Sequence, residues 1–255
     1  MDTIYLFDVD GTLTPAKSVI DHRFAKQFLK WSETREVYIV SGGSFNRIID
    51  QLGRPILDQM HGVFACMGNE YYKNLHNKSD GYSEWTKVYR NGFTIKDKQK
   101  LFDYLECIVM DSPFHIKTGR HYEERVGMVN FSVVGRNATM KQRKAYEEYD
   151  AKFQERKKIV EKLSKKFKGI DFVIGGAVSV DIFIEGNDKS QVIDRAFKDK
   201  LSSHRIVFVG DRITYPGNDH SLASALQPHK NGHAIEVESW KDTERLLTTD
   251  LFASG

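Results

Sequence analysis

The strongest constraint on this chain is the run Asp8-Val9-Asp10-Gly11-Thr12-Leu13-Thr14, directly after the apolar segment 4–7. The apolar segment predicts a short buried strand, and Gly11 supplies a tight turn where the chain leaves the sheet. Ligands bind at the carboxyl ends of strands in open α/β sheets. Two neighbouring carboxylates repel one another unless a cation lies between them, and oxygen ligands suit Mg²⁺. The sequence therefore predicts an α/β fold with a ligand site at Asp8 and Asp10.

A second strand and turn predict an anion site at the same edge of the sheet. Residues 37–40 form an apolar run, followed by Ser41-Gly42-Gly43-Ser44 and then by apolar residues at helical spacing. A helix N-terminus offers free backbone amides, and a hydroxyl beside them completes a phosphate site. We expect Ser44 to supply this hydroxyl, with Ser41 as the alternative.

The last part of the chain predicts further charged groups near Asp8. Residues 205–209 form a buried strand that leads into Gly210-Asp211, and Asn218-Asp219 open a helix. These acids would form a cluster at the sheet edge that holds Asp8. Lys189 begins another predicted helix, where its charge would balance a phosphate, although a lysine there is also compatible with a plain surface position.

The middle of the chain has a different pattern of apolar and polar residues, which predicts a separate domain. We place its first boundary in the polar stretch 77–81 and its second after residue 186. In the strand predicted around residues 178–184, Ser179 and Asp181 share the face away from the apolar core. Asn130 lies on the mostly polar face of an earlier strand. These polar faces are compatible either with exposure to solvent or with ligand binding. The nearby Arg125, Arg136 and Arg143 are compatible either with ordinary surface charges or with a phosphate site.

The run from Asp8 to Thr14 resembles the nucleophile motif of the haloacid dehalogenase (HAD) phosphotransferase superfamily. The resemblance implies that Asp8 attacks phosphorus and carries an aspartyl-phosphate, and that Asp10 acts as general acid and base. It also implies Mg²⁺ binding by Asp8, Asp10 and Asp211, with Asn218 and Asp219 in support. Ser44 and Lys189 would hold the transferring phosphate. The implied fold is a Rossmann-like core with a parallel sheet (residues 1–80 and 187–255) and an inserted α+β type-two cap (residues 81–186).

The cap motifs resemble those of the eukaryotic-type phosphomannomutases, and the likeness extends over nearly the whole chain. The motifs are 125–130 (Arg-Val-Gly-Met-Val-Asn), 135–137 (Gly-Arg-Asn), Arg143, Tyr149-Asp150 and 175–181 (Gly-Gly-Ala-Val-Ser-Val-Asp). The resemblance implies interconversion of mannose 6-phosphate and mannose 1-phosphate, with a hexose 1,6-bisphosphate as activator and a homodimer formed through the cap. The sugar and its non-transferring phosphate would be held by Lys17, Arg125, Asn130, Arg136, Arg143, Ser179 and Asp181. A sugar-phosphate phosphatase is the alternative, and a non-catalytic sugar-phosphate-binding protein is a third hypothesis.

Three departures from the family pattern bear on substrate preference and rate. Lys17 stands where the family has arginine, which keeps the charge but loses the bidentate fork. The turn 67–70 (Met-Gly-Asn-Glu) differs from the family's Glu-Asn-Gly. The segment 223–225 (Ala-Ser-Ala) lacks the aspartate of a second cation loop, so we expect no second metal there.

Composition restricts the partners that we expect. The chain of 255 residues has 38 Lys and Arg against 35 Asp and Glu, and a net charge of +3 is too small to favour nucleic acid. Cys66 and Cys107 lie in apolar surroundings, so we expect both to be buried and reduced. No apolar run reaches membrane-spanning length, and the first predicted strand leaves no room for a signal peptide. We therefore expect a cytoplasmic enzyme that binds neither nucleic acid nor membrane.

Overall fold

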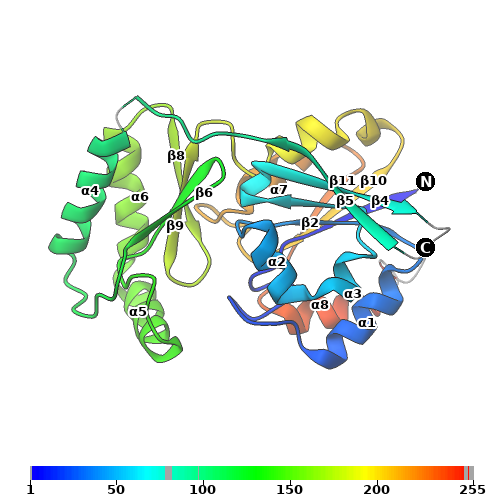
Figure 1. Ribbon diagram of the computed structural model, residues 1–255, viewed down its shortest axis with the longest axis horizontal. Helices are drawn as coiled ribbons and strands as arrows, with labels where there is room; N and C mark the ends of the chain where they lie inside the picture. The colour runs from blue at the N-terminus through cyan, green and yellow to red at the C-terminus, as the bar shows by residue number, and fades with distance from the viewer. Residues whose placement is uncertain (1, 78–81, 97, 250–251, 253–255) are drawn as a thin grey trace.

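The computed structural model describes residues 2–77, 82–96, 98–249 and 252. It has two lobes, a larger one that holds both ends of the described chain and a smaller one inserted between them (Figure 1). This architecture confirms the predicted α/β class. Among the described residues, no helix is both long and apolar enough to cross a membrane.

The larger lobe, called the core below, is built on a seven-stranded sheet in the order β11-β10-β1-β2-β3-β4-β5. The first five strands in this order are parallel, and β4 and β5 are antiparallel additions at one edge. Strands buried on both faces need continuous apolar runs, and β1 is buried from Ile4 to Phe7. The strands are β1 (Thr3–Phe7), β2 (Glu36–Val40), β3 (Gly62–Ala65), β4 (Glu70–Asn77), β5 (Tyr82–Arg90), β10 (Arg205–Gly210) and β11 (Gly232–Glu236).

Helices cover both faces of the core sheet. Because side chains alternate along a strand, Tyr5 and Phe7 pack with α1, α2, α3 and α8, whereas Ile4 and Leu6 pack with α7 and the helical turn η2. Because the central strands are parallel, their carboxyl ends lie at the same edge of the sheet. The helical elements are α1 (His22–Ser32), α2 (Phe45–Leu52), α3 (Arg54–Leu57), η1 (Cys66–Gly68), η2 (Ile193–Phe197), η3 (Asp199–Ser202), α7 (His220–Leu226) and α8 (Trp240–Leu246).

The smaller lobe, called the cap below, is a four-stranded antiparallel sheet in the order β6-β7-β9-β8 with α4, α5 and α6 on one face (Figure 1). Val180 and Ile182 pack with these helices, so Ser179 and Asp181 point to the opposite face, as predicted. That face is not solvent-facing, because Ser179 and Asp181 are both buried. The elements are α4 (Lys98–Asp111), β6 (Tyr122–Arg125), β7 (Met128–Phe131), α5 (Met140–Phe153), α6 (Glu155–Lys166), β8 (Ile170–Gly175) and β9 (Ser179–Ile184).

The expected first boundary, after residue 80, is placed too early. It falls between β4 and β5, which pair with each other along the core sheet, so residues 82–90 belong to the core. Polar residues 78–81, on which the prediction partly relied, lie outside the described residues. A hairpin turn and a domain linker have the same polar composition, and only strand pairing distinguishes them.

One cysteine also differs from expectation. Cys66 is buried, and burial raises the pKa of its thiol to about 11. Cys107 is exposed, because the buried stripe of α4 runs through Leu101, Leu105 and Val109 and leaves Cys107 on the other side of the helix.

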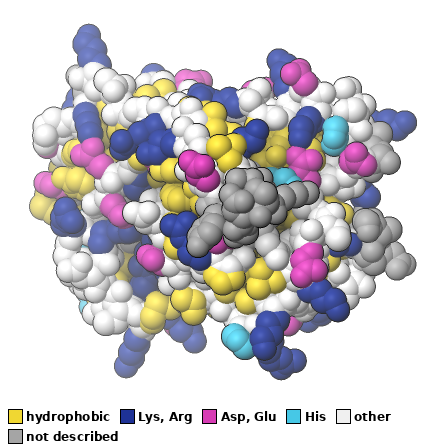
Figure 2. Space-filling model, turned by 45° about the vertical axis from the view of Figure 1, so that its right-hand side comes forward, with side chains coloured by type: hydrophobic (Ala, Val, Ile, Leu, Met, Phe, Trp, Pro, Cys, Tyr) yellow, Lys and Arg dark blue, Asp and Glu magenta, His cyan; other side chains and the backbone are white. Residues whose placement is uncertain are grey.

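Figure 2 shows basic and acidic side chains interspersed on one face of the molecule. Lys and Arg side chains lie among Asp, Glu and apolar patches. The part of this face that the structure describes therefore presents a mixed surface rather than a continuous basic one.

Candidate active site

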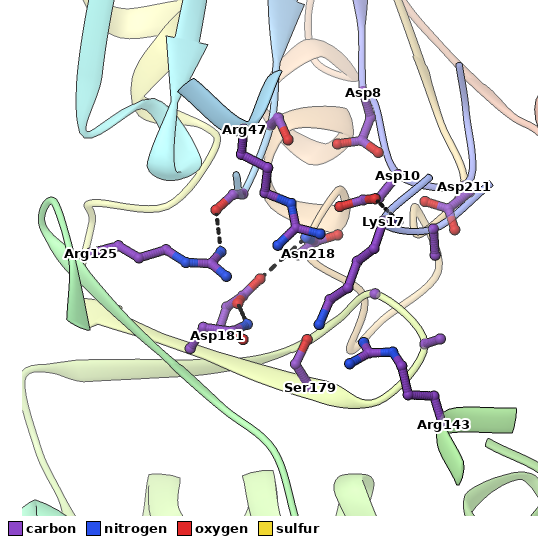
Figure 3. A pocket seen from close by; sticks show the side chains of 16 residues that line it. Asp8, Asp10, Lys17, Arg47, Arg125, Arg143, Ser179, Asp181, Asp211 and Asn218 are labelled. Atoms are coloured by element: carbon purple, nitrogen blue, oxygen red, sulfur yellow. Dashed lines mark hydrogen bonds between the residues drawn. The ribbon is translucent and has the colours of Figure 1, made fainter. Parts of the chain in front are cut away.

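A polar cleft lies between the core and the cap, at the carboxyl ends of β1, β2 and β10 (Figure 3). Most of its acidic side chains come from the core, and its basic side chains come from both the core and the cap. The cleft is lined by Asp8, Asp10, Ala16, Lys17, Ser41, Gly42, Arg47, Arg125, Asn130, Arg143, Gly176, Ala177, Ser179, Asp181, Asp211 and Asn218.

Lys189 is the charge partner of the predicted nucleophile. Its side chain is completely buried, and its Nζ donates to Asp8 Oδ1 at 2.6 Å and to Asp219 Oδ1 at 2.5 Å. Burial by itself would lower the pKa of Lys189, but the charges of Asp219 and Asp8 outweigh it and raise the pKa above its ordinary value. Lys189 is thus a fixed cation beneath Asp8, and it does not line the cleft.

The acidic cluster around Asp8 has more negative charge than Lys189 can balance. Asp8, Asp211 and Asp219 each place a carboxylate oxygen within 4.8 Å of the others. Burial, and next the charge of Asp219, raise the pKa of Asp211 to about 7. Burial likewise holds the pKa of Asp8 well above its usual range. A divalent cation would relieve this repulsion, and carboxylate oxygens are ligands that Mg²⁺ accepts.

The predicted metal set differs from this cluster in one member. Asp10 is not part of the cluster, and Asp219 is. Asp10 Oδ1 instead accepts from the backbone N–H of Lys17 at 2.5 Å and from Gln51 Nε2 at 2.9 Å. Asp219 is the less available acid, because it accepts from Lys189 and its Oδ2 accepts from the Arg212 N–H at 3.0 Å. Asp8 and Asp211 are therefore the side chains best placed to hold the ion.

Gly11 explains how Asp211 reaches this cluster. A Cβ atom on Gly11 would lie 2.4 Å from Asp211 Oδ2, and Gly11 has a φ of +93°. Both the close approach and the backbone conformation require glycine. The turn after β1 is therefore shaped to admit the acid that follows β10.

Of the two candidate hydroxyls in the turn after β2, that of Ser41 lines the cleft and that of Ser44 does not. Ser41 is the first residue after β2, is buried, lines the cleft, and accepts from the Gly43 N–H at 3.0 Å. Ser44 occupies the N-cap position of α2 and is not among the residues that line the cleft. The lining therefore favours the alternative, Ser41, over our first choice, Ser44.

The cap contributes cations and hydrogen-bonding groups, and it contacts the core directly. Arg125 Nη1 donates to Gly42 O at 2.7 Å, and Asn218 Nδ2 donates to Asp181 Oδ2 at 3.4 Å. Asp181 Oδ1 also accepts from Asn130 Nδ2 at 2.6 Å. These contacts hold the polar face of the cap sheet against the sheet edge that holds Asp8.

Arg136 stands behind the residues that line the cleft. Its guanidinium donates to Asn130 Oδ1 and pairs with the Glu123 carboxylate. Burial, and next the charge of Arg125, lower the pKa of Arg136 to about 10. Of the predicted sugar-binding residues, Arg136 is the one that does not line the cleft.

Lys17 lies among arginines, which indicates an anion site. Burial, and next the charges of Arg136, Arg143 and Arg47 in that order of influence, lower its pKa to about 6. So many cations repel one another unless an anion lies among them. The cluster therefore favours an anion position among these side chains, in the cleft that also holds Asp8 and Ser41.

Sequence reasoning missed Arg47, which lines the cleft from α2 (Figure 3). One signal was present: Arg47 is the third residue of α2. A cation near a helix N-terminus opposes the helix dipole, so it indicates a nearby anion or another compensating group.

Most of the chain matches the sequence model of a known protein family. The model described as eukaryotic phosphomannomutase matches residues 24–253. The chain belongs to the eukaryotic phosphomannomutase family. Phosphomannomutase 1 of Dictyostelium discoideum is 33% identical over 250 residues, which is 97% of this chain and 96% of the relative. Phosphomannomutase of Saccharomyces cerevisiae is 33% identical over 97% of this chain and 93% of its own, and human phosphomannomutase 1 is 32% identical over 90% and 86%.

Solved structures confirm the fold of this phosphomannomutase family member. The C-terminal domain of Candida albicans trehalose-6-phosphate phosphatase superposes with a TM-score of 0.64 at 15% identity, covering 99% of this chain and 92% of that one. A haloacid dehalogenase-like hydrolase from Bacteroides thetaiotaomicron gives 0.52 at 12% identity, over 96% of this chain and 100% of that one. At these identities the likeness concerns the fold, and it confirms the HAD-type core with a cap.

Proposed function

We propose that this phosphomannomutase family member interconverts mannose 6-phosphate and mannose 1-phosphate and feeds GDP-mannose synthesis. One observation supports the proposal beyond family membership: one cleft gathers two sets of groups that suit phosphates. Asp8 and Ser41 would meet the transferring phosphate, and Lys17, Arg47 and Arg143 would hold the other. A mutase needs both, because its bisphosphate intermediate must bind in two orientations. A phosphatase needs only the first.

The reaction begins with phosphoryl transfer between Asp8 and the sugar. Asp10 removes the proton from the sugar hydroxyl as that oxygen attacks the phosphorus of the aspartyl-phosphate, giving a hexose 1,6-bisphosphate. The bisphosphate turns end for end. Asp8 then attacks the other phosphate, and Asp10 returns a proton to the leaving sugar oxygen.

Lys189 and the cap support this chemistry in two ways. The Lys189 ammonium holds Asp8 Oδ1 in place, so the other carboxylate oxygen can point toward the phosphorus. The cap contacts through Arg125 and Asp181 close the cleft, which limits attack of water on the aspartyl-phosphate. Mg²⁺ bound by Asp8 and Asp211 would neutralise charge on the transferring phosphoryl group.

The test of this function measures isomerisation and phosphate release side by side. Purified enzyme is given mannose 1-phosphate and Mg²⁺, with and without added hexose 1,6-bisphosphate. We expect conversion to mannose 6-phosphate that depends on the bisphosphate, because it primes Asp8. Rapid phosphate release that ignores the bisphosphate would instead support the sugar-phosphate phosphatase. Binding without turnover would support the non-catalytic alternative.

Replacing Arg143 separates the two anion positions. Arg143 lines the cleft and is buried, so a charge-assisted contact to the non-transferring phosphate is worth about 1.5–3 kcal/mol. We expect Arg143→Ala to lower mutase kcat/KM by about tenfold to a hundredfold. Hydrolysis of acetyl phosphate, which has no second phosphate, should change little.

Lys144→Ala, an exposed neighbour on α5, is the matched control and should change neither reaction. Equal losses of both reactions in Arg143→Ala would mean that Arg143 supports folding or cap closure. The second phosphate position would then lie elsewhere.

Two further expectations belong to this proposal. We propose a homodimer formed through the cap, which rests on family resemblance, and a monomer mass by light scattering at micromolar concentration would contradict it.

We also propose a cytoplasmic location, since the sequence predicts reduced cysteines. Co-sedimentation of the enzyme with membranes after cell lysis would contradict it.

A further inference from the structure

Gln51 of α2 contacts the predicted acid and base from behind the cleft. Its side chain is buried, and its Nε2 donates to Asp10 Oδ1 at 2.9 Å. The backbone N–H of Lys17 donates to the same oxygen at 2.5 Å. Both groups can only donate, so Asp10 Oδ1 must accept in both hydrogen bonds.

The surroundings of Gln51 fix which end of its amide faces Asp10. Nε2 also donates to Ser18 O at 3.4 Å, a backbone carbonyl that can only accept. Thr14 Oγ1, whose own hydroxyl donates to Val9 O, also lies 3.2 Å from Nε2, so three acceptors share the two amide protons. At the other end, Arg47 Nε donates to Gln51 Oε1 at 3.4 Å, and arginine can only donate. A flipped amide would lose these contacts on both sides.

We propose that Gln51 is a positioning residue that keeps the transferable proton of Asp10 on Oδ2. Two donors occupy Oδ1, so a protonated Asp10 has its hydroxyl on Oδ2. When Asp8 attacks phosphorus, the bond between phosphorus and the sugar oxygen breaks, the bond to Asp8 forms, and the Oδ2 proton passes to the sugar oxygen. The inference rests on the proposed function only in requiring that a sugar oxygen be protonated as it leaves.

The role predicts a dependence on the leaving group. A sugar alkoxide is a strong base and needs the proton of Asp10, whereas acetate leaves from acetyl phosphate with little help. We therefore compare single-turnover phosphorylation of Asp8 by hexose 1,6-bisphosphate and by acetyl phosphate in wild type and Gln51→Met. Methionine keeps the length of the side chain and removes the amide.

We expect Gln51→Met to react about tenfold to a hundredfold more slowly with the bisphosphate, which reaches the lower end of the ~10²–10⁴-fold that a general acid contributes. Its rate with acetyl phosphate should remain within about twofold of wild type, which also shows that the variant is folded. Gln51→Glu, which keeps the shape and replaces the donor with an acceptor, should give the same contrast and serves if the methionine variant does not fold. Gln59→Met, at a half-buried glutamine that bonds Ser32 Oγ away from the cleft, is the control and should match wild type with both donors.

Equal slowing with both donors, or no slowing with the bisphosphate, would overturn the positioning role. The outcome is independent of the isomerisation assay. If the enzyme releases phosphate and does not isomerise, the mutase proposal fails. The leaving-group contrast would still stand, because a phosphatase must protonate the same oxygen.

Discussion

Replacing Asp8 with asparagine should abolish turnover and the hydroxylamine-sensitive phosphoenzyme. The amide cannot attack phosphorus, and removal of the nucleophile in a covalent enzyme costs on the order of 10⁶-fold in kcat. The fold should persist, because an asparagine Oδ1 can still accept the hydrogen bond that Lys189 Nζ gives to Asp8 Oδ1 at 2.6 Å. The measurements are mutase activity and incorporation of labelled phosphate from acetyl phosphate.

Two comparisons sharpen this result. Asp10→Asn keeps the nucleophile, so it should still form a phosphoenzyme from acetyl phosphate while sugar turnover falls by about 10²–10⁴-fold. Asp103→Asn, on the exposed side of cap helix α4, should behave as wild type. Substantial turnover by Asp8→Asn would remove the covalent mechanism altogether.

Lys189→Met should both destabilise the protein and inactivate it. The Lys189 side chain is completely buried between Asp8 and Asp219, so its removal leaves two buried carboxylates without a cation. Breaking a buried ion pair by removing one partner costs about 3–5 kcal/mol. We expect a corresponding fall in the free energy of unfolding in urea, measured without Mg²⁺ so that metal binding does not offset the loss.

A surface lysine and a double variant provide the controls. Lys200 pairs with Glu36 at 2.7 Å, but both side chains are partly exposed, so Lys200→Met should cost only about 0–1 kcal/mol. Adding Asp219→Asn to Lys189→Met removes one of the unpaired charges and should recover part of the lost stability. A loss in Lys189→Met no larger than in Lys200→Met would mean that Asp8 and Asp219 are protonated or solvated in the folded protein.

The acidic and glycine-rich turns could be read from the sequence because each depends on a few adjacent residues. An apolar run followed by a turn predicts a strand end, and parallel strands bring their ends to one edge. This reasoning placed Asp8, Asp10 and Asp211 at one site, and the resemblance to the phosphomannomutases added Lys17; all four line the cleft. Period-two alternation likewise assigned Ser179 and Asp181 to one face of a cap strand.

Other features depend on contacts between distant segments, and these could not be predicted. Strand β5 pairs with β4 in the core sheet and does not begin the cap. A polar stretch of sequence is compatible with either a hairpin or a domain linker, and only the pairing of the strands on either side distinguishes the two. Ser41 and Ser44 both fit the anion motif, and only the position of β2 in the sheet selects Ser41. Arg47 was missed because its role depends on charges that the cap supplies.

The sequence by itself therefore determined the chemistry at each strand end and the family to which the chain belongs. Tertiary structure decided how those groups are paired: Lys189 with Asp8 and Asp219, and Gln51 with Asp10. The residues of the Lys189–Asp8 pair are 181 positions apart, and those of the Gln51–Asp10 pair are 41 apart. Local sequence patterns indicate secondary-structure propensity and periodicity. The direction of a hydrogen bond, and the partner that neutralises a buried charge, depend instead on which side chains folding places within about 3 Å of one another.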